Sequence, residues 1–477
     1  MVRHPEDPFR ILVLGDFSGR APKENSRRAS QPLRIDRDNF DVVMEKIGVR
    51  LSSLDVDPNL EPQDLPFRVL DDFHPDHLFS QLAVFSKLRD LRERLDDDRS
   101  FEAAAQELQS WLTPTSAAPE IQVSANNCNT TVTSESILDS VLESSAAQVD
   151  VDSASWTSLI QKIAAPHAIP SIGRRQSEML SYIDSLISST MTSVLHTPKF
   201  RFLESAWRGL AKLVYDLETS PELKIYVLDI SQEQLRNDLE HPEGLESSQL
   251  YNELVEQTVG IAGSERWSLL LANYAFGTGQ EDITCLSQIS RIATAADASL
   301  VSMIVDVNGR ESREPDFERL LTDLEQSQAW EEFRNNEGAA GTVIVWPEFL
   351  LRLPYGTATK PIEAFQYEEV ANCPQDLLWG NAAFLVAQMM GELFGSYGWE
   401  IPVGQRYEFA DLPLWIKEDA GNTHIHPCGR MLISDRQAQR LKSIGINPIV
   451  SVRDQAEVML LGCTSTAGTG WIGPWSR

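Results

Sequence analysis

The sequence FLLRLPYGTATKPIEAFQYEEVANCPQDLLWGNAAF, from Phe349 to Phe384, decides how the rest of the chain is interpreted. In its first part three leucines surround Arg352, and Pro354 then ends any regular element. The Tyr-Gly pair that follows signals a turn, so this part predicts the entry to a buried loop. A catalytic role for Arg352 or Tyr355 would need a partner acid, base or nucleophile, and none stands out nearby in the sequence.

The second part of this stretch predicts a helix that begins near Asp376. Its apolar side chains cover more than one face, which is typical of a helix enclosed by protein. These side chains are Leu377, Leu378, Ala382, Phe384, Leu385, Met389, Leu393 and Phe394. The order Leu-Arg-Leu-Pro-Tyr-Gly and then Trp-Gly-Asn-Ala-Ala-Phe resembles the signature region of the large subunit of the bacterial type VI secretion contractile sheath, a relative of phage tail sheaths.

Residues 9–112 carry a second set of motifs. An apolar run, Phe9–Leu14, ends in Gly-Asp-Phe-Ser-Gly, which predicts a buried strand that leaves into a turn. Ile-Asp-Arg-Asp-Asn-Phe from Ile35 and Leu-Asp-Asp-Phe-His-Pro-Asp from Leu70 follow, and a helix is then expected from Leu78 to Leu95. In this order the motifs resemble the small subunit of the same sheath. The whole chain therefore resembles a natural fusion of the small (TssB-like) and large (TssC-like) subunits.

Two helices are predicted after residue 176, and from Leu223 onward predicted strands and helices alternate, which favours an α/β sheet flanked by helices. The segment His196–Leu210, HTPKFRFLESAWRGL, also resembles the sheath large subunit. The resemblance implies a phage-tail-sheath-like fold with mixed sheets and a smaller N-terminal α/β segment. Near the end, Met431–Ser434 is expected to form a strand, and the last residues, GTGWIGPWSR, to form an exposed tail.

A change of composition divides the chain. Residues 113–136 are rich in Thr, Ser, Ala, Asn and Pro, which is typical of a linker. We therefore expect a small-subunit-like region at 1–112, a linker at 113–175 and a large-subunit-like region at 176–477.

Within this linker a short amphipathic helix is predicted from Ser134 to Ala146. Its apolar stripe consists of Ile137, Leu138, Val141 and Leu142. Such a stripe suits capture in a partner's groove, and the alternative is that it packs on its own domain. In the sheath large subunit a Leu-rich helix near the N-terminus resembles this one and is bound by the hexameric ClpV-type AAA+ ATPase that disassembles contracted sheath. The resemblance therefore makes this helix a candidate docking site for such an ATPase.

The composition excludes several classes of protein. A chain of 477 residues with 42% hydrophobic residues is expected to form two or three domains. Its formal charge of −29 disfavours nucleic-acid binding. Five scattered cysteines without a CxxC pair argue against a disulfide framework or a zinc site. Because neither a long apolar run nor a secretory leader is present, we expect a cytoplasmic protein without membrane insertion.

One cluster near residue 70 has side chains of the kinds that ligate metals. It consists of Asp71, Asp72, His74, Asp76 and His77. The start of a helix attracts the same acids and a first-turn proline, and this explains the cluster more simply. A metal-dependent cytoplasmic enzyme remains a less favoured alternative. The Gly15–Gly19 turn has neither the order of a nucleophile elbow nor that of a phosphate loop.

The resemblance implies a structural role without catalysis or cofactors. Related subunits assemble into a helical tube around an inner-tube protein, on a baseplate, and contract to propel the inner tube. The family links its protomers through strands lent to neighbouring sheets, partly by an N-terminal extension of the small subunit. Only eight residues precede Phe9 here, so such links are expected to be absent or rearranged. The alternative is a sheath-derived accessory or adaptor protein that does not polymerise.

Overall fold

The computed structural model describes residues 6–19, 31–52, 64–112, 176–306, 314–369, 374–419 and 422–476. A nine-stranded mixed sheet forms its centre. The strands lie in the order β11 (Tyr407–Phe409), β15 (Val458–Leu460), β14 (Ile446–Ser451), β8 (Thr342–Trp346), β7 (Ser299–Ile304), β6 (Leu269–Phe276), β1 (Phe9–Gly15), β5 (Leu223–Asp229) and β2 (Leu33–Ile35). The strands from β14 to β5 are parallel, and β2, β15 and β11 pair antiparallel at the two sides. The α/β sheet predicted from the alternating pattern is confirmed.

Strand β1 lies between strands that come from much later in the chain. Ile11 pairs with Ile225 of β5 on one side and with Leu269 of β6 on the other. Phe9, Ile11 and Val13 belong to one hydrophobic core and Leu12 and Leu14 to the other. Because successive side chains of a strand point to opposite faces, a central strand with both faces covered needs an unbroken apolar run. The sequence of β1 meets this requirement.

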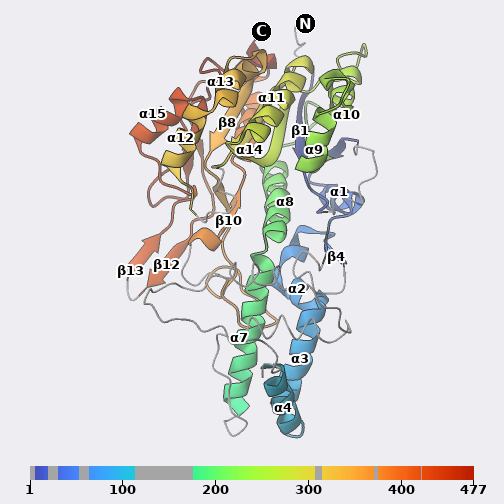
Figure 1. Ribbon diagram of the computed structural model, residues 1–477, viewed down its shortest axis with the longest axis vertical. Helices are drawn as coiled ribbons and strands as arrows, with labels where there is room; N and C mark the ends of the chain where they lie inside the picture. The colour runs from blue at the N-terminus through green and yellow to red at the C-terminus, as the bar shows by residue number, and fades with distance from the viewer. Residues whose placement is uncertain are drawn as a thin grey trace.

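Helices cover both faces of the sheet (Figure 1). One face is covered by α8 (Pro198–Asp216) and α14 (Ala383–Tyr397). The other face is covered by α9 (Gln232–Leu239), α11 (Gln280–Ala295), α12 (Phe317–Gln326), α13 (Gln328–Arg334) and α15 (Asp435–Ser443). Capping boxes formed by Ser231 with Gln234 and by Ser434 with Gln437 start α9 and α15.

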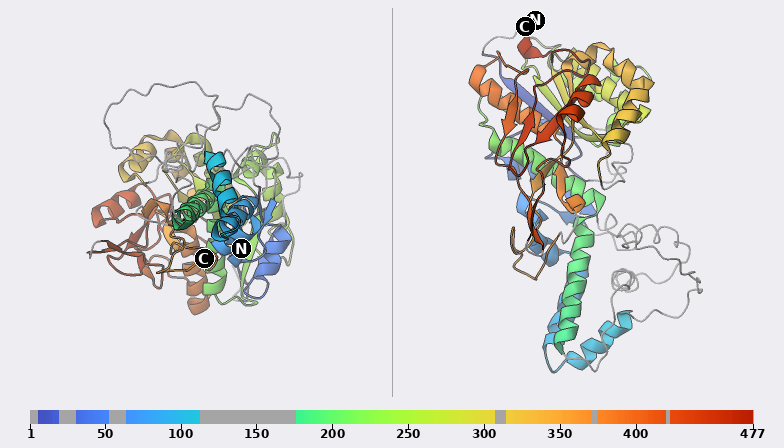
Figure 2. Two further views of the ribbon diagram at one scale, coloured as in Figure 1. Left: turned by 90° about the horizontal axis from the view of Figure 1, so that it is seen from below. Right: turned by 90° about the vertical axis from the view of Figure 1, so that its left-hand side faces the viewer.

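Three helices extend away from the sheet as an arm (Figures 1 and 2). They are α3 (Ala83–Asp96), α4 (Phe101–Leu112) and α7 (Gln176–Leu195). Arg92 Nε donates to Asp184 Oδ1 at 2.5 Å and so joins α3 to α7. A single helix from Leu78 to Leu95 was expected, but extended backbone at Leu82 separates α2 (Pro75–Gln81) from α3. This break lets both helices direct apolar faces into the core.

Smaller elements complete the fold. They are α1 (Phe40–Ile47), the short turn α10 (Gln249–Tyr251), and the antiparallel pairs β3 (Arg50–Ser52) with β4 (Asp64–Pro66), β9 (Phe349–Arg352) with β10 (Leu378–Gly380), and β12 (Ile416–Asp419) with β13 (Asn422–Ile425). None of the described helices combines the length and the apolar character that crossing a bilayer requires.

The predicted helix start near Asp376 is wrong. Leu378 and Trp379 lie in β10, which pairs with β9, and the helix α14 starts at Ala383. The side chain of Asn381 accepts a hydrogen bond from the Ala383 N–H at 2.9 Å, which helps to start the helix there. A short apolar run is compatible with a strand as well as with a helix, and here the pairing with β9 makes it a strand.

The C-terminal segment is not an exposed tail. Trp471 and Trp475 are buried, and the Ile472 N–H donates to Ala340 O at 3.0 Å. The ring of Trp475 lies 6.4 Å from that of Phe9 at the start of β1, which brings both ends of the described chain together (Figure 1). Packing removes the large apolar surface of these two tryptophan side chains from water, whereas a solvated tail would leave it exposed. The strand expected at 431–434 is also absent, because this stretch leads into the capping box of α15.

Candidate functional site

A buried carboxylate on α8 is the centre of the site. Leu203 and Trp207 belong to the apolar stripe of α8, and Glu204 lies within this stripe with 0% of its surface exposed. A charged group in such a place is stable only when it is paired and hydrogen-bonded. The partners of Glu204 come from β9, from α8 itself and from the signature loop, the name used here for residues 353–369.

Arg352, the last residue of β9, binds two buried carboxylates at once. Its guanidinium donates to Glu204 from Nε at 2.7 Å and from Nη2 at 3.1 Å. It also donates to Glu369 from Nη1 at 2.7 Å and from Nη2 at 2.9 Å. A further bond from Nη1 reaches Leu353 O at 3.1 Å. All five N–H groups of the guanidinium are therefore used, which only an arginine can provide.

Tyr355 and Arg208 close the network. The Tyr355 N–H donates to Glu369 at 2.8 Å, and the Arg352 guanidinium lies 4.1 Å from the centre of the Tyr355 ring. Arg208 stands one turn after Glu204 on α8 and donates to it at 2.7 Å and to the Tyr355 hydroxyl at 3.0 Å. Two arginines thus balance two glutamates, and α8, β9 and both ends of the signature loop are joined.

The network fixes the protonation of its members. Burial opposes ionisation of Glu369, but the attraction of Arg352 and several hydrogen bonds outweigh it and lower the pKa to about 2. For Glu204, burial is likewise outweighed by Arg352 and Arg208, and its pKa is lowered. Burial raises the pKa of Tyr355 to about 12. Around neutral pH both glutamates are therefore ionised and Tyr355 is protonated, an arrangement suited to holding segments together.

Motifs of the small-subunit-like and large-subunit-like regions contact one another at the signature loop. The ring of His74, which precedes α2, packs edge-on against Tyr355 with 4.9 Å between ring centres. The Asp76 carboxylate accepts the N–H groups of Glu363 at 3.2 Å and Ala364 at 3.0 Å. The helix start of the small-subunit-like region therefore holds the signature loop of the large-subunit-like region.

Two members of the cluster considered as a metal site, Asp72 and His74, accept backbone hydrogen bonds. Asp72 accepts the Arg68 and Val69 N–H groups, and His74 Nδ1 accepts the Asp76 N–H at 3.2 Å. Over the described parts of the chain, no group of three or more His, Cys, Asp or Glu side chains is arranged to hold a metal ion. Helix-start chemistry accounts for the positions of Asp72, His74 and Asp76.

The Gly15–Gly19 turn is also held by backbone bonds. Asp229 at the end of β5 accepts the N–H groups of Phe17 at 2.8 Å and Ser18 at 2.9 Å. Trp207 on α8 donates to Phe17 O at 2.8 Å. Ser18 is buried in this turn, which joins β1 to β5 and α8.

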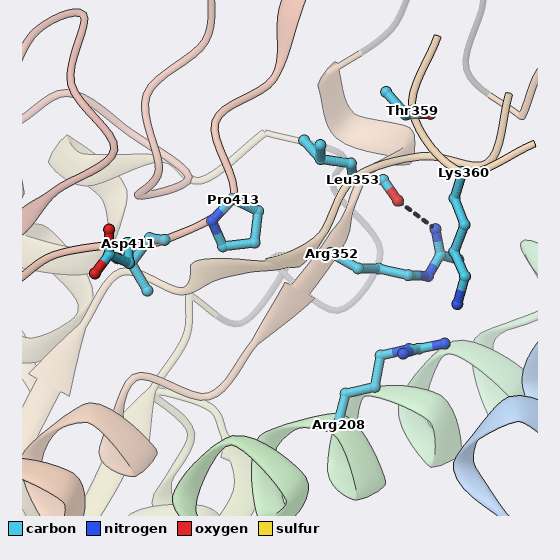
Figure 3. Close-up of a pocket in the computed structure, with 8 residues that line it drawn as sticks. Arg208, Arg352, Leu353, Thr359, Lys360, Asp411 and Pro413 are labelled. Carbon is cyan, nitrogen blue, oxygen red and sulfur yellow. Dashed lines mark hydrogen bonds between the residues drawn. The ribbon is translucent and has the colours of Figure 1, made fainter. Parts of the chain in front are cut away.

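A cavity of about 390 Å³ opens beside the ion network (Figure 3). Its lining comes from α8, from the end of β9, from the signature loop and from the segment before β12. The lining residues are Arg208, Arg352, Leu353, Thr359, Lys360, Asp411, Leu412 and Pro413. Cationic groups gather on one side of this cavity, and Leu353 and Pro413 form part of an apolar wall.

Sequence reasoning singled out Arg352 and Tyr355 but missed their partners. Glu204 interrupts an apolar helical stripe, and an acid in that position was a signal for a buried cation nearby. Glu369 gave no comparable signal, because its position in the fold depends on the path of the signature loop. The predicted docking stripe Ile137, Leu138, Val141 and Leu142 lies outside the described residues.

Comparisons with known proteins agree with this architecture. Residues 177–467 match the family described as EvpB/VC_A0108, tail sheath N-terminal domain. Residues 2–118 match the family described as Type VI secretion system, VipA, VC_A0107 or Hcp2. The chain is also similar to the type VI secretion system sheath protein TssC1 of Pseudomonas aeruginosa, with 29% identity over 301 residues. That similarity covers 60% of this chain and 60% of the relative. The chain therefore belongs to the tail sheath family of the type VI secretion system and fuses a small-subunit (TssB-like) region to a large-subunit (TssC-like) region.

Proposed function

We propose that this chain is the protomer of a type VI secretion contractile sheath, which assembles into a helical tube and contracts to propel an inner tube. The observation that carries this proposal is the place of β1, which pairs with β5 and β6 inside one sheet. One polypeptide thus supplies the joined core of both subunit types. Such a chain can repeat along a helix without a separate small subunit.

The ion network supports a mechanical role. Contraction of a helical lattice can proceed by rigid-body movement between two packed arrangements. Each protomer must then keep its shape while its contacts change. The bonds from Arg352 to Glu204 and Glu369 tie α8, β9 and the signature loop into one body. This role requires no active site, and we propose that the chain is not an enzyme.

The proposed partners follow from the family. Copies of the chain would meet through heterologous contacts that do not close into a ring of fixed size. An inner-tube protein, a baseplate and a ClpV-type ATPase complete the proposed machine, which would operate from the cytoplasm. The division at residues 112 and 176 belongs to the same proposal, with the ATPase-docking helix between the two sheath regions.

Negative-stain electron microscopy tests the proposed assembly. The purified chain is imaged alone and then after coexpression with the products of neighbouring genes. Hollow tubes or cogwheel rings are expected. Discrete small particles in both preparations would overturn the proposal and favour a sheath-derived accessory or adaptor protein that does not polymerise.

A pull-down tests the proposed ATPase contact separately. Deletion of residues 134–146 is expected to abolish retention of a ClpV-type ATPase, while tubes still form. Replacement of Ile137, Leu138, Val141 and Leu142 by serine keeps the length of the segment and should have the same effect. Equal retention by the parent chain and both variants would show that the ATPase does not use this stripe.

A further inference from the structure

The cavity beside the ion network holds more cationic than anionic groups. Arg208, Arg352 and Lys360 converge on one side of it (Figure 3). Glu204 and Glu369 compensate the two arginines, as their hydrogen bonds show. Lys360, whose side chain is 47% exposed, is the cation of this lining that Glu204 and Glu369 do not bind.

Among the described residues, Lys360 has a weak carboxylate partner, and its Nζ also lies 5.8 Å from the centre of the Tyr355 ring. Its Nζ lies 3.9 Å from Asp71, whose side chain is 89% exposed. An ion pair with so exposed a carboxylate contributes little. Burial and the nearby Arg208 both lower the pKa of Lys360, which reflects the crowding of positive charge. An additional anion between Lys360 and Arg208 would relieve this crowding.

The shape of the cavity fits a side chain rather than a bare ion. Leu353, Leu412 and Pro413 contribute apolar side chains to the lining. The carboxylate of Asp411 points away from the cationic groups (Figure 3). A volume of about 390 Å³ exceeds what a single carboxylate group needs. A Glu or Asp side chain from another polypeptide could place its methylene groups on the apolar wall and its carboxylate between the cations.

The charge of the chain indicates where this acid would come from. Asp and Glu number 70 against 41 Lys and Arg, so every copy presents an excess of carboxylates to its neighbours. A cationic pocket on such a chain is complementary to the rest of its own surface. We propose that this pocket receives an acidic side chain from a second copy of the chain. The inference rests on the proposed function, because it requires copies of the chain to meet.

Zero-length cross-linking tests the proposal directly. Unlabelled and ¹⁵N-labelled chains are purified, mixed in equal amounts and allowed to assemble. A carbodiimide then joins lysine amines to carboxylates with loss of water, and mass spectrometry identifies the linked peptides. Lys360 is expected in peptides of mixed isotope composition. Lys360 found only in links within one copy, to Asp71 for example, would overturn the proposal even if tubes form.

Charge variants provide an independent measurement. K360E should weaken self-association in sedimentation velocity by at least about tenfold, whereas K360Q should have a smaller effect. K46E is the matched control, since Lys46 is an exposed lysine on α1 and the substitution changes the charge equally, and it should change association less than about twofold. Unchanged thermal unfolding would show that K360E still folds. Equal association of K360E and K46E would overturn the pocket proposal alone, and absence of association in the parent chain and every variant would overturn the proposed sheath function as well.

Discussion

At the scale of single residues, burial decides what the signature motif does. Arg352 is 9% exposed and Glu204 is fully buried, so neither can rely on water to solvate its charge. Each is stable because the other is present. The motif therefore acts through complementary charges that lie 148 positions apart in the chain.

Removal of the Glu204 charge should destabilise the folded chain. E204Q keeps the shape of the side chain but leaves Arg352 and Arg208 without their shared carboxylate. We expect the free energy of unfolding to fall by about 3–5 kcal/mol, measured by urea denaturation. The control is E318Q, because Glu318 is 70% exposed in its pair with Arg440 and should contribute below about 1 kcal/mol. Equal losses in the two variants would contradict the buried network.

Acid should weaken the same network. The pKa of Glu369 is lowered from 4.5 to about 2 in the folded chain, so its stabilising effect is complete above about pH 4.5 and declines as the pH falls toward 2. The stability difference between the parent chain and E369Q should shrink by about 2 kcal/mol between about pH 7 and pH 3. Urea titrations at a series of pH values measure this difference. A difference that stays constant over this range would contradict the lowered pKa.

At the scale of elements, two glycines set the distance between α8 and α14. A Cβ added at Gly209 of α8 would lie 2.5 Å from the Phe384 ring, and one added at Gly391 of α14 would lie 2.6 Å from Leu217. Both contacts are shorter than packed atoms allow. The two helices can approach this closely only because neither position carries a side chain.

Alanine at a glycine in this helix contact should destabilise the chain, whereas alanine at an exposed glycine of α14 should stabilise it. G209A gains helix propensity but forces Phe384 to move, and we expect it to lower the free energy of unfolding by about 1–3 kcal/mol. G395A is the matched control, because no atom lies within 4 Å of its added Cβ. It should stabilise the chain by up to about 1 kcal/mol. Chemical denaturation compares the two, and a stabilising G209A would show that α8 and α14 are packed less closely.

At the scale of the whole molecule, the two sheath regions share one sheet, and they also meet where His74 and Asp76 contact the signature loop. Strand β1 has hydrogen-bonded neighbours on both sides, and Asp76 in the first turn of α2 accepts a backbone hydrogen bond from the signature loop. Separation of the regions would open the sheet and expose both hydrophobic cores. The covalent connection is therefore not what holds them together.

Cleavage between the two sheath regions tests whether non-covalent contacts hold them together. A specific protease site is inserted between residues 113 and 175, and the purified chain is cut there. The two fragments should elute together in size-exclusion chromatography under native conditions and separate only in denaturant. The uncut chain serves as the reference for elution volume. Fragments that separate without denaturant would contradict the shared sheet.

Local sequence by itself determined much of this protein. The apolar run of β1, the capping boxes of α9 and α15 and the motif order that identifies both sheath regions all follow from residues close together in the chain. Tertiary structure alone decided where β1 pairs, that Leu378 and Trp379 form a strand, and that Trp471 and Trp475 are buried. It also decided that Glu204 and Glu369 meet Arg352. Periodicity and capping act over a few residues, whereas strand pairing, the burial of aromatic rings and the pairing of buried charges depend on contacts between segments that lie far apart in sequence.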